Sequence, residues 1–339
     1  MVSIKDIAAA CGVSIATVSK ALNDHRDVSA STKTLIRETA KKMGYLPNSQ
    51  ARALKTNRTY NLGVLFAEKT QSGLTHSHFA AVLNGFKKEA EANGYDITFI
   101  NQQMGKSRMT YYEHCMFRSI DGVVVACVDD YEDEGVTELL ASSIPAVTID
   151  YQSPGKPAVI SDNAFGMKTL TEYIYEMGHR KIAYIYGDAS KVTSVRLENF
   201  RETLKSLNIN VRSDYLRGGR YHDPETTEKL AAELVQLDDP PTCILMPDDF
   251  SAIGAMTAFE KLGLSVPDDV SIAGYDGILL SKFLNPRLTT FEQDTESLGA
   301  QAARQLIARI RKEISADVPA VTVSGCLRKG SSVKRLIGE

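Results

Sequence analysis

The sequence of 339 residues predicts an α/β protein with a small all-helical head and a larger body of two Rossmann-like lobes. Two observations lead to this prediction. The first sixty residues carry short apolar stripes at helical spacing, with glycine turns between them. From Tyr60 onward, continuous apolar runs alternate with amphipathic helical stretches, which is the pattern of parallel strands covered by helices on both faces.

The N-terminal residues predict two short helices joined by a tight turn. Ser3 is placed to cap a first helix, and Gly12 can adopt the left-handed backbone that a tight turn needs. Ser14 is placed to cap a second helix. Helix, glycine turn and helix form the helix-turn-helix pattern, in which the start of the second helix enters the DNA major groove. Its outward side chains would be Ile15, Ala16, Thr17, Ser19 and Lys20.

A third helix is expected to start at Ser29 or Ser31 and to end at Gly44, which completes a head of residues 1–46. A hinge and linker, 47–59, follow it. Residues 48–55 contain good helix formers but are too few for a stable isolated helix, so this helix needs a partner. The alternative is a plain linker.

Residues 60–339 alternate strands and helices, and about ten such units are too many for one small sheet. Ligands of such sheets bind at the carboxyl ends of the strands. The expected strands are 62–66, 96–100, 122–127, 146–150, 181–186, 243–247 and 270–275. Helical stretches between and after them include 78–93, 164–177, 192–207, 224–236, 251–262 and 295–312.

Charge is divided unevenly along the chain. Residues 1–60 carry ten Lys and Arg against four Asp and Glu, whereas the remainder carries 29 against 38. A basic head on an acidic body indicates a polyanionic partner for the head alone. Five scattered cysteines without metal or redox spacing, and no signal-peptide pattern, lead us to expect a cytoplasmic protein with reduced thiols.

Several other classes of protein are disfavoured by the sequence. No apolar run of eighteen residues would span a membrane. Phosphate-binding, dinucleotide-binding and zinc-protease motifs are missing, so we expect no cofactor, no metal site and no enzyme activity. A stand-alone binding protein is disfavoured by the basic head and the missing signal-peptide pattern, and a sugar-modifying enzyme by the missing catalytic set. A DNA-binding regulator is therefore the favoured class.

The head and hinge resemble the LacI/GalR family of transcription regulators. The matching stretches are SIKDIAAACGVSIATVSKALN and VSASTKTLIRETAKKMGYLPNSQARALKT. The resemblance implies that Ile15, Ala16 and Lys20 face bases, whereas Thr17, Ser19 and Asn23 hold phosphates. It also implies that two hinge helices of a homodimer pair in the minor groove of a near-palindromic operator. Their DNA-binding residues would be Asn48, Ala51, Leu54 and Lys55, with Leu54 as the wedge between central base pairs.

The body resembles the effector domain of the same family, a fold of the periplasmic-binding-protein type. The matching stretches include SDNAFGMKTLTEYIYEMGHRKIAYIYG, VPDDVSIAGYDG and NPRLTTFEQDTESLGAQAARQLI. The resemblance implies that the chain crosses between lobes near 159–161, 288–292 and 320–323. The first lobe would then comprise about 60–160 and 291–321, and the second about 161–290 and 322–339.

Candidate effector-binding side chains lie after the strands or where the family places its ligand contacts. Carboxylates accept hydrogen bonds from hydroxyls, arginine donates a fork, and an aromatic face covers a sugar ring, so a sugar is the expected effector. The family more often has Asn-Asp where this chain has Asp248-Asp249. The candidates are His78, Phe79, Asp150, Tyr151, Arg196, Tyr221, Asp249 and Asp276. We therefore predict a repressor whose operator affinity a small molecule controls, with the direction of control left open.

Overall fold

A computed structural model describes residues 2–46, 58–67, 73–128 and 130–336. The chain divides into two compact units, Met1–Thr59 and Tyr60–Glu339, which we describe one at a time. The predicted hinge residues Asn48, Ala51, Leu54 and Lys55 lie outside the described residues.

The head contains three helices around one small core. They are α1 (Ile4–Cys11), α2 (Ile15–Leu22) and α3 (Ala30–Lys42). Gly12 ends α1 with a φ of 65°, the left-handed conformation that the turn requires. Ser29 starts α3 because its hydroxyl accepts a hydrogen bond from the backbone N–H of Thr32, so Ser29 rather than Ser31 is the cap. The buried core residues are Ile7, Ala8, Val18, Ala21, Ile36 and Ala40.

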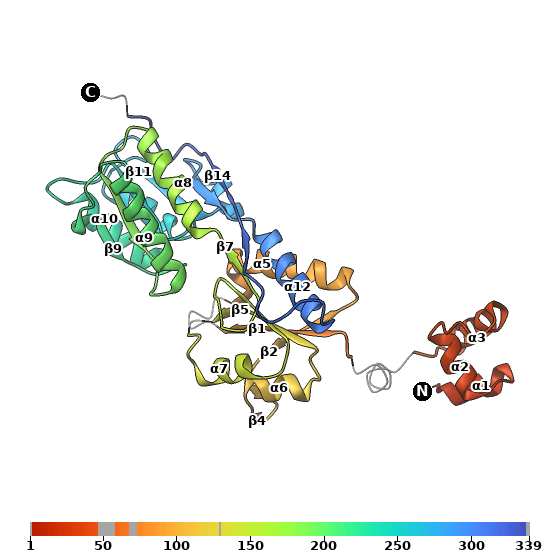
Figure 1. Cartoon of the computed structure of the whole chain (residues 1–339). Coiled ribbons are helices and arrows are strands. Elements are labelled where there is room, and N and C mark those ends of the chain that lie inside the picture. Colours follow the sequence, from red (N-terminus) through yellow and green to blue (C-terminus); the bar gives the residue numbers. More distant parts are fainter. Residues whose placement is uncertain (1, 47–57, 68–72, 129, 337–339) are drawn as a thin grey trace. The chain divides into compact units, whose positions relative to one another are not determined.

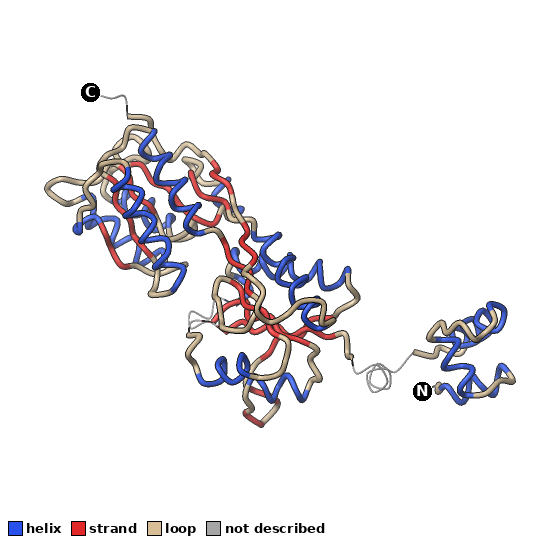
Figure 2. Tube along the Cα trace, in the orientation of Figure 1, coloured by secondary structure: helices blue, strands red, loops and turns tan. Residues whose placement is uncertain are grey.

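The body contains two lobes, each built on a six-stranded sheet with helices on its faces (Figures 1 and 2). The first sheet is parallel and has the order β13-β7-β6-β5-β1-β2. Its strands are β1 (Asn61–Ala67), β2 (Asp96–Ile100), β5 (Gly122–Val128), β6 (Ala146–Ile149), β7 (Ala158–Ser161) and β13 (Val321–Val323). Its helices are α5 (Ser77–Ala92), α6 (Tyr111–Phe117), α7 (Glu134–Ala141) and α12 (Thr295–Ile310).

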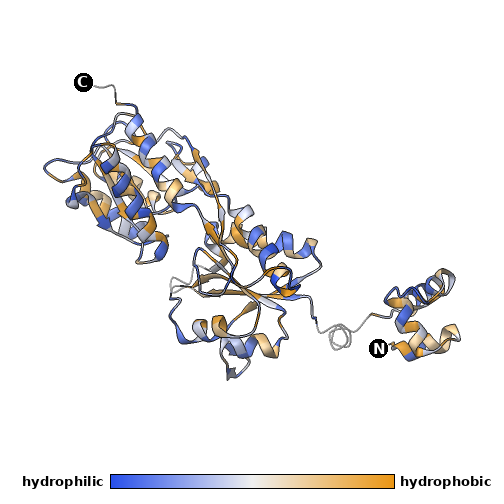
Figure 3. Ribbon diagram, in the orientation of Figure 1, coloured by the Kyte–Doolittle hydropathy of each residue, from blue (hydrophilic) through white to orange (hydrophobic). Residues whose placement is uncertain are grey.

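The second sheet has the order β14-β12-β11-β10-β8-β9 and is parallel except for β14. Its strands are β8 (Ile182–Tyr186), β9 (Leu216–Gly218), β10 (Cys243–Leu245), β11 (Ser271–Asp276), β12 (Thr289–Glu292) and β14 (Cys326–Arg328). Its helices are α8 (Asn163–Glu176), α9 (Lys191–Ser206), α10 (Pro224–Val235) and α11 (Ala252–Lys261). Apolar residues gather on the strands of both lobes, as Figure 3 shows.

All seven predicted strands are present, and the predicted helices begin and end within about two residues of the observed ones. The sequence analysis did not single out five short strands of the two large sheets, β7, β9, β12, β13 and β14, or the two-residue strands β3 (Gln103–Met104) and β4 (Ser107–Arg108). It also did not single out α6 and α7. A strand of two to four residues is too short for periodicity to distinguish it from a loop.

The chain passes from one lobe to the other after β7, after β12 and after β13. The expected lobe limits differ slightly from these positions. Ser161 still pairs in the first sheet, Glu292 in the second and Val323 in the first, so each change of lobe comes one or two residues later than expected.

Two glycines let α5 and α12 pack closely over the first sheet. A side chain on Gly85 would overlap the backbone of Glu296, and one on Gly299 would overlap the carbonyl oxygen of Val82. Each helix therefore presents a glycine to the backbone of the other. This contact joins segments about 200 residues apart in sequence into the core of one lobe.

Candidate functional site

The exposed face of α2 carries the side chains that were predicted to contact DNA. Ile15 is 49% exposed, Ala16 and Lys20 are also exposed, and Val18 and Ala21 on the opposite face are buried. The helix therefore keeps its apolar stripe inside the head and presents Ile15, Ala16 and Lys20 to solvent, whereas the predicted contacts Thr17 and Ser19 are half-buried.

Three polar residues of α2 and its ends have local partners. Thr17 Oγ1 lies 2.8 Å from the hydroxyl of Ser14, the residue that caps α2. The side-chain amide of Asn23 donates to the carbonyl of Ser19 at 2.7 Å. Lys20 pairs with Asp27, an acidic residue that the sequence analysis did not single out.

The body presents two strained aspartates at the carboxyl ends of strands. Asp150 follows β6 with a φ of 53°, and Asp276 ends β11 with a φ of 102°. Positive φ is unfavourable for a residue with a side chain, and such strain is concentrated at functional sites. Asp150 accepts hydrogen bonds from the backbone N–H and hydroxyl of Ser161, at 2.6 and 3.2 Å.

Asp276 lies between basic side chains of both lobes. One carboxylate oxygen, Oδ1, is 3.8 Å from His78 Nδ1 of the first lobe and 3.8 Å from Arg196 Nη2 of the second. The same oxygen accepts a hydrogen bond from Gln293 at 2.6 Å. The two 3.8 Å separations are too long for hydrogen bonds, so neither basic group binds this carboxylate directly.

Arg196 is buried and held in one orientation by its own lobe. Its Nε donates to Asn163 Oδ1 at 2.7 Å and its Nη1 to the carbonyl of Pro247 at 3.3 Å. The guanidinium carbon lies 3.7 Å from the ring centre of Tyr275 and 5.7 Å from that of Tyr221. The arginine therefore stands between aromatic faces, with its charge directed towards Asp276.

The remaining predicted residues lie around this group, but they are not equally available. Phe79 packs against the rings of His76 and His78, and Tyr151 stacks on Tyr131 with ring centres 3.6 Å apart. Asp249 is turned into the second lobe, where its two oxygens accept from Thr290 Oγ1 at 2.5 Å and from Ile278 N–H at 2.9 Å. Both carboxylate oxygens of Asp249, which were expected to face an effector, therefore already accept hydrogen bonds from the second lobe.

A column of stacked rings that sequence reasoning missed joins the lobes. His76, at the start of α5, stacks on His222 of the second lobe with ring centres 4.4 Å apart. His222 in turn stacks on Phe250 at 4.0 Å. His222 lies beside the predicted Tyr221 in a loop with no periodicity, and this proximity was the only signal that could have located it.

Burial sets the protonation of the groups that meet between the lobes. It raises the pKa of Asp276, although Arg196 opposes the shift, and it raises the pKa of Asp150. It lowers the pKa of His78 to about 4, so this ring is neutral at pH 7. Five buried polar atoms around this group have no hydrogen-bond partner among the described residues: Nδ1 of His76 and of His78, the hydroxyls of Tyr184 and Tyr275, and Oε1 of Gln293. Buried polar atoms normally have partners, so these atoms have hydrogen-bonding capacity that the described residues do not use.

Other kinds of site find no support in the described part of the chain. No group of three or more His, Cys, Asp or Glu is placed there to hold a metal ion. Among the same residues, no helix is long and apolar enough to cross a membrane.

Comparison with known proteins identifies both units. Residues 3–48 match the model of bacterial regulatory proteins of the lacI family, and residues 171–333 match that of the periplasmic binding protein-like domain. The HTH-type transcriptional repressor PurR of Pasteurella multocida is 31% identical over 92% of this chain and 93% of its own length. PurR of Pectobacterium carotovorum is 34% identical over 91% of each chain.

Solved structures show the same fold. The lac repressor dimer bound to operator and the anti-inducer ONPF matches with a TM-score of 0.82 at 23% identity, covering 98% of this chain and 99% of that one. A complex of the transcriptional regulator CelR with cellobiose matches with a TM-score of 0.71 at 23% identity, covering 98% and 100%. With its helix-turn-helix head and its two-lobed effector-binding domain, this chain belongs to the LacI family of DNA-binding transcriptional repressors and is not an enzyme.

Proposed function

We propose that this repressor binds a near-palindromic operator as a homodimer and that a small neutral molecule in the interlobe cleft controls its affinity for DNA. The observation that carries this proposal is the meeting of His78, Asp276 and Arg196 from both lobes around partnerless polar atoms. A molecule that binds these groups joins the lobes, so its binding favours one lobe arrangement over another.

A sugar is the first candidate effector. Hydroxyl groups can donate to Asp276, accept from Arg196 and use the free Nδ1 of His78, and Tyr221 offers an aromatic face. Solved structures of this fold hold cellobiose and ribose, which agrees with this candidate.

A flat nitrogen heterocycle is the second candidate, and the column of stacked rings favours it. His76, His222 and Phe250 are already arranged face to face across the lobes. An aromatic ligand would extend or replace this stack, and its ring nitrogens and exocyclic groups would bind Asp276 and Arg196.

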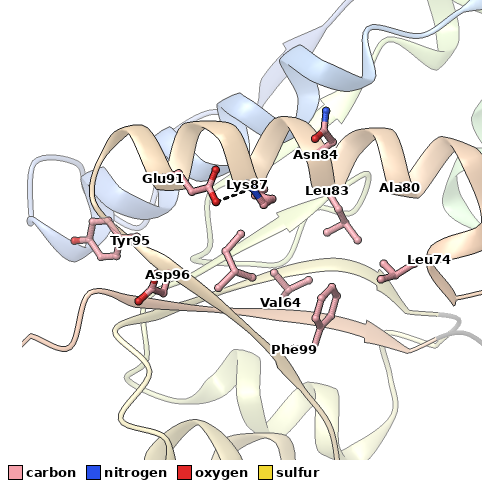
Figure 4. A pocket seen from close by; sticks show the side chains of 11 residues that line it. Val64, Leu74, Ala80, Leu83, Asn84, Lys87, Glu91, Tyr95, Asp96 and Phe99 are labelled. Carbon is pink, nitrogen blue, oxygen red and sulfur yellow. Dashed lines mark hydrogen bonds and ion pairs between the residues drawn. The ribbon is translucent and has the colours of Figure 1, made fainter. Parts of the chain in front are cut away.

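The homodimer has a candidate surface on the first lobe. An open groove of about 510 Å³ lies between α5 and the edge strand β2 (Figure 4). Leu74, Leu83 and Phe99 line it, and Lys87 and Glu91 pair at its rim at 2.6 Å. Phe99 is 46% exposed on β2, whose outer edge has no pairing strand among the described residues. A second copy of the chain would cover these apolar side chains and that edge.

The proposed control acts through the hinge, residues 48–55. A segment this short needs contacts from its twin and from the minor groove to form a helix. Cleft closure would change the distance between the points where the two hinges join the first lobes. The effector would then order or melt the hinge helices and leave the heads folded.

The cleft can be tested with Arg196→Met, which removes the charge and keeps much of the volume. Thermal shift with neutral sugars and with nucleobases would identify a ligand, and calorimetry would then measure its affinity for the variant. We expect a loss of about 2–5 kcal/mol in ligand binding, with operator binding retained in a gel shift. Wild-type ligand affinity in the variant would remove Arg196 from the site.

Arg212→Met is the matched control. Arg212 pairs with Asp214 and Asp239 on the surface of the second lobe. Its replacement removes one arginine charge from the same lobe but none from the cleft. We expect this control to keep both ligand affinity and operator affinity.

A further inference from the structure

An acidic side chain lies beside Lys20, one of the residues predicted to face bases, in a head that carries a net positive charge. Asp27, in the loop between α2 and α3, accepts a hydrogen bond from Nζ of Lys20 in the last turn of α2. Both side chains are about half exposed, at 53% and 48%. The lysine holds the pKa of Asp27 below its usual value, so the residue is ionised at neutral pH. A carboxylate at this place is repelled by DNA phosphates, so it weakens general binding to DNA.

The loop holds Asp27 beside Lys20 without depending on their ion pair. Asp24 pairs with Lys33 at 3.0 Å and with Arg37 at 2.9 Å, which fastens the loop to α3. At the end of the loop, Val28 packs on the core of the head. Exposed ion pairs add little to stability. The contact between Asp27 and Lys20 is therefore not needed to fold the loop, and its position points to a role in the interface.

The two side chains together match one base pair better than the others. In the major groove, a G·C pair presents the acceptors N7 and O6 of guanine and then the N4 donor of cytosine. A lysine donates to the first two, and an aspartate accepts from the third. In an A·T pair, the carboxylate would instead face O4 of thymine, an acceptor, and the two oxygens would repel each other.

We propose that Asp27 is a specificity-determining residue that reads a G·C pair of the operator half-site together with Lys20. Lys20 donates to guanine, and Asp27 accepts from N4 of cytosine and rejects thymine. This inference rests on the proposed operator binding, and it adds to that proposal a named base pair and an acidic reader. The Asp27 carboxylate thus lowers the affinity for DNA of any sequence and raises the preference for G·C over A·T at this position.

The test is selection of binding sites from a randomised duplex library by the full-length chain and by Asp27→Ala. We expect the wild type to require G·C at one position of each half-site. Asp27→Ala should accept A·T there, with discrimination lowered about tenfold, and should bind unrelated duplex DNA more tightly. Lys20→Met should lose the preference for guanine at the same position.

Glu38→Ala is the matched control, because Glu38 is an exposed acidic residue of α3 in the same head. It removes the same charge, so it should raise general affinity without changing any base preference. The inference is wrong if Asp27→Ala keeps the full requirement for G·C, or if the two alanine variants change selection equally. A wild-type chain that selects no sequence would instead refute the proposed operator binding, and this inference with it.

Discussion

Replacing His78 with phenylalanine should weaken effector binding without lowering the stability of the fold at neutral pH. The His78 ring is buried, and its Nδ1 has no hydrogen-bond partner. Phenylalanine keeps an aromatic ring in the contact with Phe79 and removes both the partnerless nitrogen and the titration. We therefore expect the variant to be at least as stable as the wild type at pH 7 and to bind the effector poorly.

The size of the change in unfolding free energy with pH follows from the pKa of His78, which burial lowers from 6.5 to about 4. The folded state favours the neutral ring, so the stability present at neutral pH is lost as the pH falls through 6.5 towards 4. One pKa unit corresponds to about 1.4 kcal/mol. Acidification from pH 7 to pH 4.5 should therefore cost the wild type about 2–3 kcal/mol at this side chain, and His78→Phe should not show this loss.

The assay is urea unfolding at each pH, followed by far-ultraviolet circular dichroism because the chain has no tryptophan. Asp150 and Asp276, whose pKa values are raised, oppose the histidine effect. The difference between the two curves reports His78 together with its influence on the pKa of Asp150. Parallel pH dependence in wild type and variant would refute this reasoning. So would a large loss of stability in the variant at pH 7.

His179→Phe is the control for burying a phenylalanine in place of a histidine. Both ring nitrogens of His179 have partners, Thr242 Oγ1 at 2.9 Å and the carbonyl of Lys334 at 3.0 Å. Its replacement removes both of these hydrogen bonds, so we expect a loss of about 1–3 kcal/mol at pH 7. Effector affinity should not change.

Three further predictions concern packing, capping and DNA contact. Gly299→Ala should place a methyl group against the Val82 carbonyl and lower the free energy of unfolding by about 1–3 kcal/mol, measured by urea titration; unchanged stability would mean that α5 and α12 separate easily. Ser29→Ala removes the cap of α3 and should cost the head about 1 kcal/mol, measured as its melting temperature. Thr17→Ala should weaken gel-shift binding to all sequences alike, and a changed base preference would contradict its assignment to phosphate.

The elements with strong local signals could be predicted from the sequence. Capping serines and a left-handed glycine determine the helices of the head, and long apolar runs determine the central strands. The short outer strands β13 and β14 were missed. Each is held by pairing with a distant neighbour, β7 or β12, and not by a pattern of its own.

The cleft was predictable in its residue types but not in the directions of the side chains. Asp249 follows β10 as expected, yet Thr290 and Ile278 bind its oxygens inside the lobe. Arg196 was located by resemblance to a family, because a single arginine on a helix has no local signature. His222 and Phe250 lie in loops, and only the folded chain brings them to His76.

The crossings between the lobes have a consequence for the order in which a ribosome completes this protein. The first lobe needs α12 and β13, and the second needs β14 (Cys326–Arg328). Neither sheet can therefore be completed until the C-terminal part of the chain has been synthesised. The head, residues 2–46, has its own core and is complete once those residues have emerged. A nascent chain therefore carries a finished DNA-binding head for most of its synthesis, before either half of its sensor can assemble.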